Sequence, residues 1–275
     1  MKRIVALLLL CALLFTGCGK KSNHDGIVLA ATTKPVAEFT AAIASGTGIE
    51  IRLMVTENVG CLHDYTLTVR QMELLETADA VVISGCGLEA FMQDVLDRRD
   101  QVIDASQGME CSDPHIWLDP ARAAKMAENI AGELSVLYPQ YTGVFEENLT
   151  ELKAAFTQLQ TYAAEQTKHL TCRELVTFHD GFSCFAEALD MTVLAAMEEE
   201  HGSTVAAKDL IGIMQLVKSH RLPAIFTETN GSESAAKTVA AETGTKIFTL
   251  DMAMGEMDYF EAMYHNINTV KEAFS

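Results

Sequence analysis

Basic residues are scarce in this 275-residue chain, with 20 lysines and arginines against 38 aspartates and glutamates and a formal net charge of −18. A chain this acidic does not bind nucleic acid through the phosphates, because that binding needs clustered positive charge. Proline (5) and glycine (17) are few, and 49% of the residues are hydrophobic, so we expect a globular chain with an ample core. The length favours two domains or one large one.

The chain also lacks an apolar run long enough to remain in a membrane. Its N-terminal run, residues 4–15, is about a dozen residues long, whereas a spanning helix needs about twenty. Two basic residues precede this run and small residues follow it, which is the pattern of a secretory signal peptide. The end of the run resembles a bacterial lipobox. We therefore predict a signal peptide over 1–17, a lipid anchor on Cys18 that holds the chain outside the cytoplasm at the cell membrane, and a polar tether over 18–26. A plain secretory signal is the alternative.

No Cys-x-x-Cys pair occurs among the seven cysteines, which argues against a thiolate zinc site or a redox motif. Five cysteines lie beyond the predicted anchor, so at least one thiol is unpaired within the chain. Outside the cell, a disulfide could join Cys61 with Cys86, or Cys172 with Cys184. Buried thiols that pack as small hydrophobic groups are the alternative.

Apolar runs typical of strands alternate with helical patterns in both halves of the chain. Strands are predicted at 27–31, 49–55, 80–84, 101–105, 174–180, 191–197, 224–229 and 246–251. Helices are predicted at 34–44, 66–78, 87–96, 120–135, 181–189, 205–220, 231–243 and 258–273. The repeated alternation of strand and helix is typical of an α/β fold with mostly parallel sheets.

A long helical pattern separates the two halves. Residues 138–170 carry Leu, Phe and Tyr at spacings of three and four, with no proline after Pro139 and no glycine after Gly143. One helix of this length spans roughly 50 Å at about 1.5 Å per residue and makes a stiff connector. The predicted domains are therefore an N-terminal α/β lobe (27–137), this linking helix, and a C-terminal α/β lobe (171–275).

Three of the eight histidines lie at the end of a strand-like run or in a turn before a helix. They are His63 in "CLHDYTL", His115 in "SDPHIWLDP" and His179 in "TFHDGF", and Asp251 ends the last predicted strand in the same manner. In open α/β sheets, ligands gather beyond the carboxyl ends of the strands. Three imidazoles and one carboxylate suit a tetrahedral Zn²⁺. Each residue alone is more often structural, but four at equivalent places, two in each half, predict a metal site.

The segment around His115 is stiff on both sides. Pro114 fixes its own φ and biases Asp113 toward an extended conformation. The Asp-Pro pair at 119–120 suits a helix N-cap and first helical position. His115 is thus held in a short, rigid segment, as a metal ligand requires, although a well-made turn into a helix is the alternative. Trp117, the only tryptophan, is large enough to pack in a cleft between domains.

Several carboxylates are candidates to orient the ligands, because ligating histidines usually donate their other ring N–H to a carboxylate or carbonyl. Asp64 and Asp180 directly follow two of the candidate histidines, and Asp113 lies two residues before the third. Glu228 closes a neighbouring predicted strand. It could ligate in place of Asp251 or orient a ligand.

Together these segments resemble the zinc- and manganese-binding lipoproteins that serve ABC importers, a family of metal-specific solute-binding proteins. The stretches that carry the resemblance, in the family's order, are "CLHDYTLTVRQMELLETADAVVISGCGLEAFM", "DPHIWLDP", "TFHDGF", "AIFTET" and "AAETGTKIFTLD". The resemblance covers almost all of the chain after the predicted signal peptide. It implies two α/β lobes joined by a long helix with the metal between them, and it carries His63, His115, His179 and Asp251 over as ligands.

The function that the resemblance implies is a lipid-anchored, monomeric receptor. It would capture a divalent metal outside the membrane and deliver it to an ABC permease and, through the permease, its ATPase. A histidine at 179 favours Zn²⁺, since manganese-selective relatives tend to place a carboxylate there and harder oxygen ligands suit Mn²⁺. A manganese or mixed receptor of the same type is the alternative. The stiff helix favours limited closure on binding, with local shifts around Asp251 and residues 252–257.

Two other functions compete with this interpretation. A zinc hydrolase would need an open water position and a general base, but the chain has no His-Glu-x-x-His stretch and no nucleophile motif. We therefore expect no enzyme. An adhesin-like role, often attached to relatives, has no sequence feature for or against it. The His/Asp-rich loop of many zinc members is absent before His115.

Overall fold

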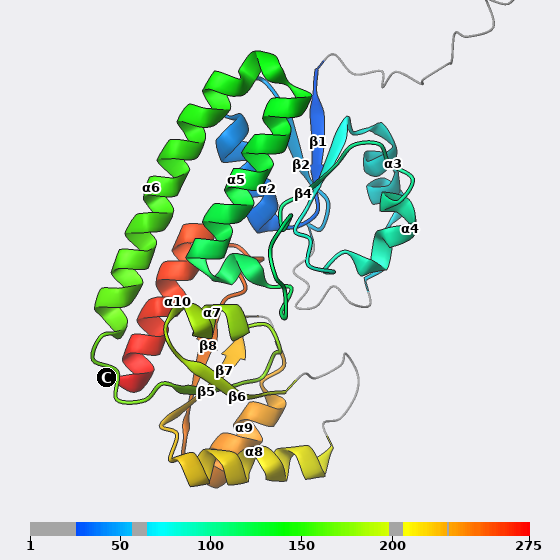
Figure 1. The fold of residues 1–275 in the computed structure, drawn as a ribbon. Helices are drawn as coiled ribbons and strands as arrows, with labels where there is room; N and C mark the ends of the chain where they lie inside the picture. The colour runs from blue at the N-terminus through cyan, green and yellow to red at the C-terminus, as the bar shows by residue number, and fades with distance from the viewer. Residues whose placement is uncertain (1–25, 57–64, 198–205, 230) are drawn as a thin grey trace, which may run out of the picture.

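Two four-stranded parallel sheets organise the part of the chain that the computed structural model describes, residues 26–56, 65–197, 206–229 and 231–275. The first sheet has the order β2-β1-β3-β4, from strands β1 (Val28–Ala31), β2 (Glu50–Leu53), β3 (Ala80–Ile83) and β4 (Val102–Asp104). The second has the order β6-β5-β7-β8, from β5 (Glu174–Thr177), β6 (Thr192–Ala196), β7 (Ala224–Glu228) and β8 (Lys246–Leu250). Figure 1 shows the first sheet in the upper half of the molecule and the second in the lower half. The predicted α/β fold with two mostly parallel sheets is confirmed.

The central strands are apolar on both faces because helices cover both faces of a parallel sheet. Every residue of β1, β3 and β7 is buried. The edge strand β2 alternates between exposed and half-buried residues. Each predicted strand contains one observed strand, which is shorter by one to three residues at its ends.

The helices match the predicted order and positions with one exception, the helix predicted over 87–96. They are α2 (Lys34–Ala44), α3 (Val69–Thr77), α4 (Gln93–Leu96), α5 (Pro120–Leu137), α6 (Thr142–Thr167), α7 (Ser183–Ala188), α8 (Ala207–His220), α9 (Ser234–Thr243) and α10 (Tyr259–Phe274). Asp119 caps α5 by accepting from the backbone N–H groups of Ala121 and Arg122, and Pro120 is its first residue, as predicted. Within the described residues, no helix has both the length and the apolar character that crossing a membrane requires.

The helix predicted over 87–96 is wrong in its first half. Residues 85–87 instead form a turn in which Gly85, Cys86 and Gly87 all have positive φ. Glu89 folds back onto this turn, where its carboxylate accepts from the backbone N–H groups of Ser84 and Gly85 at 2.8 and 3.0 Å. Only the short 3₁₀ helix η1 (Ala90–Met92) and α4 follow. The positive φ of Gly87, the first residue of the predicted helix, is incompatible with a right-handed helix there and explains the later start.

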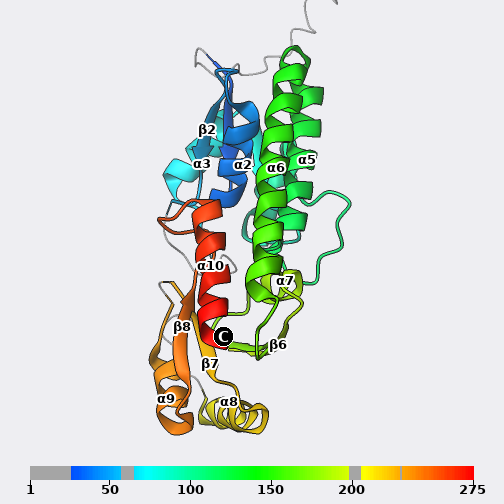
Figure 2. The ribbon, with the colours of Figure 1, turned by 90° about the vertical axis from the view of Figure 1, so that its left-hand side faces the viewer.

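The long helix α6 runs alongside both halves of the molecule. Figures 1 and 2 show it beside α2 and α5 in the upper half and beside α10 in the lower half. Its 26 residues span about 39 Å at 1.5 Å per residue. It begins at Thr142 rather than 138, because the 3₁₀ helix η3 (Pro139–Tyr141) intervenes. The predicted long connecting helix is therefore present.

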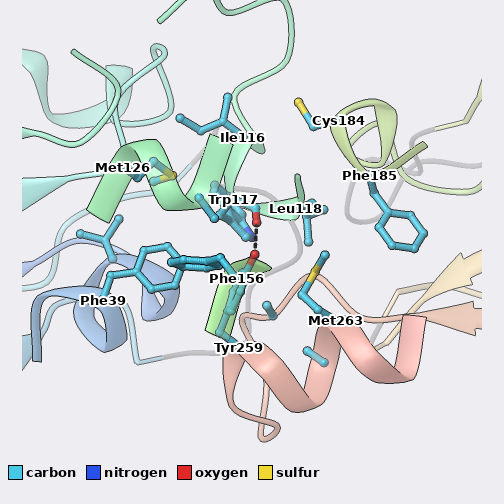
Figure 3. Packing of buried hydrophobic residues seen from close by; sticks show 14 of the residues in the cluster. Phe39, Ile116, Trp117, Leu118, Met126, Phe156, Cys184, Phe185, Tyr259 and Met263 are labelled. Atoms are coloured by element: carbon cyan, nitrogen blue, oxygen red, sulfur yellow. Dashed lines mark hydrogen bonds between the residues drawn. The ribbon is translucent and has the colours of Figure 1, made fainter. Parts of the chain in front are cut away.

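A buried aromatic cluster joins the two halves where α6 passes between them. The ring of Phe156 on α6 lies 5.3 Å from that of Phe39 on α2 and 5.7 Å from that of Tyr259 on α10. The Tyr259 hydroxyl donates to the backbone oxygen of Trp117 at 2.8 Å (Figure 3). Trp117 lies in the 3₁₀ helix η2 (Ile116–Leu118) just before α5. The segment that follows His115 is thus packed into the core between the two sheets.

One disulfide, Cys86–Cys111, occurs in the described residues, and Cys172 and Cys184 are free thiols. The possible pairing of Cys172 with Cys184 is therefore wrong, and Cys86 pairs differently from the Cys61 alternative. The bridge forms because β3 and β4 are adjacent in the sheet, which brings the turn after β3 beside the loop after β4. Cys61 lies outside the described residues.

Candidate metal centre

His115 is held by a carboxylate two residues before it. One oxygen of Asp113 lies 2.8 Å from the His115 backbone nitrogen and 2.7 Å from its Nδ1, and both side chains are buried. Burial raises the pKa of Asp113, but the hydrogen bonds from the His115 side chain and backbone outweigh it and leave this pKa below its ordinary value. The carboxylate is therefore ionised at neutral pH and can only accept, so Nδ1 of His115 is the donor of this hydrogen bond. In the neutral imidazole, this leaves the lone pair on Nε2, the atom that a metal would bind.

His179 has a similar arrangement in the second half of the molecule. It follows β5, is 4% exposed, and has its Nδ1 3.5 Å from Oε2 of Glu228, the last residue of β7. A Cβ atom on Gly181 would lie 2.8 Å from His179 Nε2 and 2.8 Å from the end of the Met252 side chain. A side chain at 181 would therefore press on the imidazole of His179, and Gly181 lies beside the Nε2 edge of that ring.

The structure brings His115 and His179 together. Their ring centroids are 5.5 Å apart, and the ring of Trp117 lies 5.3 Å from that of His115. The Trp117 indole N–H donates to the backbone oxygen of Met252 at 2.8 Å. Trp117 therefore packs where the two halves meet, and it connects the His115 segment to the segment after β8.

Asp251 is buried directly after β8, and its backbone is fixed by a side chain of α10. Its N–H donates to Oδ1 of Asn266 at 2.7 Å, and its carbonyl accepts from Nδ2 of the same residue at 2.7 Å. One carboxylate oxygen of Asp251 accepts from the backbone N–H of Ala253. The main chain of Asp251 is therefore held on both sides, and one of its carboxylate oxygens is engaged within the segment that follows it.

The remaining predicted residues do not complete a cluster. His63, Asp64 and Cys18 lie outside the described residues, and Asp180 is exposed. Across 26–56, 65–197, 206–229 and 231–275, no three His, Cys, Asp or Glu residues form a group that could hold a metal. The described residues therefore supply two adjacent imidazoles, each beside a carboxylate, and the four-residue ligand set remains a prediction.

Two kinds of supporting residue were not predicted from the sequence. Asn266 lies on the buried face of α10 with Met263 and Ile267. A polar residue on this apolar face is the sequence signal that could have indicated a buried hydrogen-bonding role. Lys34 and Glu38 of α2 contact the segment after Asp251 from the other half of the molecule. No local pattern indicates these contacts, since they join residues more than 200 positions apart.

The comparison with protein families gives one match over nearly the whole chain. The family model described as "ZnuA: Zinc-uptake complex component A periplasmic" matches residues 29–273.

The curated relatives are distant but extensive. The chain is 27% identical to the zinc-binding lipoprotein AdcA of Streptococcus pneumoniae over 308 residues, which cover 99% of this chain and 61% of AdcA. It therefore spans less than two thirds of the length of that relative. It is 26% identical to the manganese-binding lipoprotein MntA of Bacillus subtilis, with 98% of both chains covered.

The fold resembles a solved structure described as the Zn(II)-bound ZnuA-like domain of Streptococcus pneumoniae AdcA. The TM-score is 0.79 at 25% identity, and the match covers 90% of this chain and 99% of that one.

Proposed function

Since the chain belongs to the ZnuA family of periplasmic zinc-uptake components, we propose that it is the extracytoplasmic receptor of an ABC importer, which captures Zn²⁺ and delivers it to a membrane permease. The observation that carries the proposal is the pair His115 and His179. These buried imidazoles come from different halves of the molecule, their ring centroids are 5.5 Å apart, and each lies beside a carboxylate.

The proposed ligands are His63, His115, His179 and Asp251. Asp113 holds the proton on Nδ1 of His115, so that Nε2 presents its lone pair to the metal. Glu228 has the same orienting role toward Nδ1 of His179 at 3.5 Å. We assign Glu228 to orientation rather than ligation because its carboxylate faces the histidine nitrogen. Four protein donors would leave no open position for a water, which separates a binding site from the site of a zinc hydrolase.

Zinc is favoured over manganese by the donor set. Imidazole nitrogen suits Zn²⁺, whereas Mn²⁺ prefers a larger share of carboxylate and carbonyl oxygen. The likeness to a manganese-binding lipoprotein supports the manganese or mixed receptor as the alternative. The same four side chains could bind either metal, so the ratio of the Zn²⁺ and Mn²⁺ affinities distinguishes a zinc receptor from a manganese or mixed one.

The partners follow from this function. We propose that Cys18 carries a lipid anchor outside the cytoplasm, that residues 18–26 form the tether, and that the receptor acts as a monomer on a permease driven by an ATPase. The proposed domains are the lobes 27–137 and 171–275 and the connection 138–170.

The experiment is a competitive calorimetric titration of the metal-stripped protein with Zn²⁺ and Mn²⁺. One zinc per chain with a nanomolar Kd, much weaker manganese, and a large loss in His179→Ala are expected. His220→Ala is the matched control, because His220 also pairs with a glutamate, at 2.9 Å, but lies exposed on α8. Comparable manganese affinity would favour the alternative receptor, and no effect of His179→Ala would contradict the ligand set.

A further inference from the structure

The segment between β8 and α10, residues 252–258, is attached to the opposite half of the molecule. It begins directly after Asp251 and belongs by sequence to the C-terminal half. Yet its first carbonyl, that of Met252, accepts from the indole of Trp117 in the N-terminal half. We call this segment the Asp251 loop.

Lys34, the first residue of α2, binds three consecutive carbonyls of the Asp251 loop. Its ammonium donates to the backbone oxygens of Gly255 at 2.6 Å, Glu256 at 3.2 Å and Met257 at 2.6 Å. The Lys34 side chain is 19% exposed, so its charge is partly desolvated. Hydrogen bonds from an ionised donor are stronger than those between neutral groups. One side chain of the N-terminal half therefore satisfies the carbonyls of three successive residues in the other half.

Glu38, one turn further along α2, holds the other end of the loop. Its carboxylate accepts from the backbone N–H of Tyr259, the first residue of α10, at 2.8 Å and lies 3.7 Å from Lys34. Tyr259 itself donates through its hydroxyl to the backbone of Trp117. The loop is thus bound to the N-terminal half at its start, along its length and at its end.

Asp251 lies at the junction between this bound loop and the second sheet. On one side it continues β8, and on the other it continues the Asp251 loop. Asn266 couples its backbone to α10, whose N-terminus is fixed by Glu38. Asp251 is therefore attached to both parts of the molecule, to the second sheet through β8 and to the N-terminal half through its loop and α10, so its position depends on how the two are placed.

We propose that Lys34 and Glu38 are positioning residues for Asp251, which hold its loop on the N-terminal half and thereby slow the release of the bound metal. The inference rests on the proposed function, since it requires Asp251 to ligate the metal. It identifies Asp251 as the proposed ligand whose position depends on how the two halves are placed relative to each other. Loss of the Lys34 contacts frees the loop, and Asp251 then leaves the metal more often.

The test is the rate of zinc release from the zinc-loaded protein after mixing with excess chelator, followed by the fluorescence of Trp117. Lys34→Met is expected to release zinc at least about tenfold faster, because hydrogen bonds to a charged donor are lost, while the association rate changes little. Lys34→Arg keeps a charged donor, and its rate of zinc release is expected to lie between those of the parent and Lys34→Met. Lys237→Met is the matched control: Lys237 of α9 also pairs with a glutamate four residues away, but its side chain is exposed.

Two further variants separate positioning from general loosening of the fold. Val239→Ala removes buried volume in the second half without touching the loop, and its release rate should match the parent's. In an Asp251→Ala background, Lys34→Met should have no further effect, since it acts through Asp251. If the parent binds no zinc, the proposed function fails. If it binds zinc but Lys34→Met releases at the parent rate, or accelerates release equally without Asp251, the positioning role is wrong.

Discussion

Replacing Asp113 by asparagine tests how much the carboxylate behind His115 contributes to metal binding. Asparagine keeps the shape of the side chain, and its oxygen can still accept from the backbone N–H that lies 2.8 Å away. It loses the negative charge that stabilises the N–H at Nδ1 across 2.7 Å. Removal of such a partner behind a ligating histidine typically weakens metal binding 10- to 100-fold, or about 1.4–2.7 kcal/mol. We expect the zinc Kd of Asp113→Asn to rise within that range.

The fold should respond separately from the site. The second oxygen of Asp113 is buried with no hydrogen-bond partner among the described residues. The amide NH₂ placed there would be a buried donor without an acceptor, which costs about 1–3 kcal/mol of unfolding free energy. Thermal or urea unfolding of the metal-stripped protein measures this loss.

The assay for the site is a competition titration of zinc, with Glu174→Gln as the control. Glu174 pairs with His220 at 2.9 Å, but both side chains are more than one third exposed. The control should therefore leave the zinc Kd unchanged. A change of less than threefold in Asp113→Asn, with the protein folded, would refute the orienting role of Asp113.

Three further predictions concern the frame around the site. Glu89→Gln should lower the free energy of unfolding in urea by about 1–3 kcal/mol. The carboxylate accepts hydrogen bonds from two backbone N–H groups, and the amide would turn its own NH₂ donor toward one of them. Burial raises the pKa of Glu89, so the native state binds this proton more tightly than the unfolded chain. Its contribution should be greatest below about pH 4.3, the ordinary value for glutamate, and should decrease as the pH rises through the raised pKa; a parent–variant difference that grows with pH would contradict this. Replacing Cys86 by serine removes the disulfide between residues 25 positions apart and should lower the unfolding free energy by about 3.5 kcal/mol. Reductant should lower the stability of the parent by the same amount and leave that of the variant unchanged. Phe156→Ala should cost about 3–5 kcal/mol, since its fully buried ring contacts both halves; a loss below 1 kcal/mol in calorimetric unfolding would show that this cluster does not join them.

Much of the fold could be predicted because the relevant signals are local. Strands β1 and β3 are buried on both faces and consist of apolar residues alone, and the buried strand β7 begins with an apolar run, so each differs from the helices beside it. The start of α5 was predicted to the residue, because Asp119 and Pro120 suit a cap and a first helical position whatever their tertiary surroundings. The same local stiffness singled out His115.

The failures depend on tertiary contacts that no local pattern records. The partner of Cys86 is determined by the adjacency of β3 and β4. The helix expected from 87 is displaced by the positive-φ turn at 85–87, which the disulfide from Cys86 ties to the loop after β4. In the sequence, Lys34 is only a lysine at the start of a helix. Its role depends on the Asp251 loop, which it contacts in the fold. Asn266 shows only as a polar residue on an apolar helix face. Residues that hold a buried carboxylate or its loop from a distant segment are for this reason the hardest to predict.

We propose that zinc is bound by three imidazoles and one carboxylate drawn from both halves of the molecule. X-ray absorption at the zinc edge of the protein loaded with one equivalent tests it most directly. We predict four nitrogen and oxygen donors at about 2.0–2.2 Å with no sulfur at about 2.3 Å. His63→Ala, His115→Ala and His179→Ala should each remove one imidazole from the spectrum. Sulfur in the parent spectrum, or an unchanged imidazole count in His115→Ala or His179→Ala, would contradict the account.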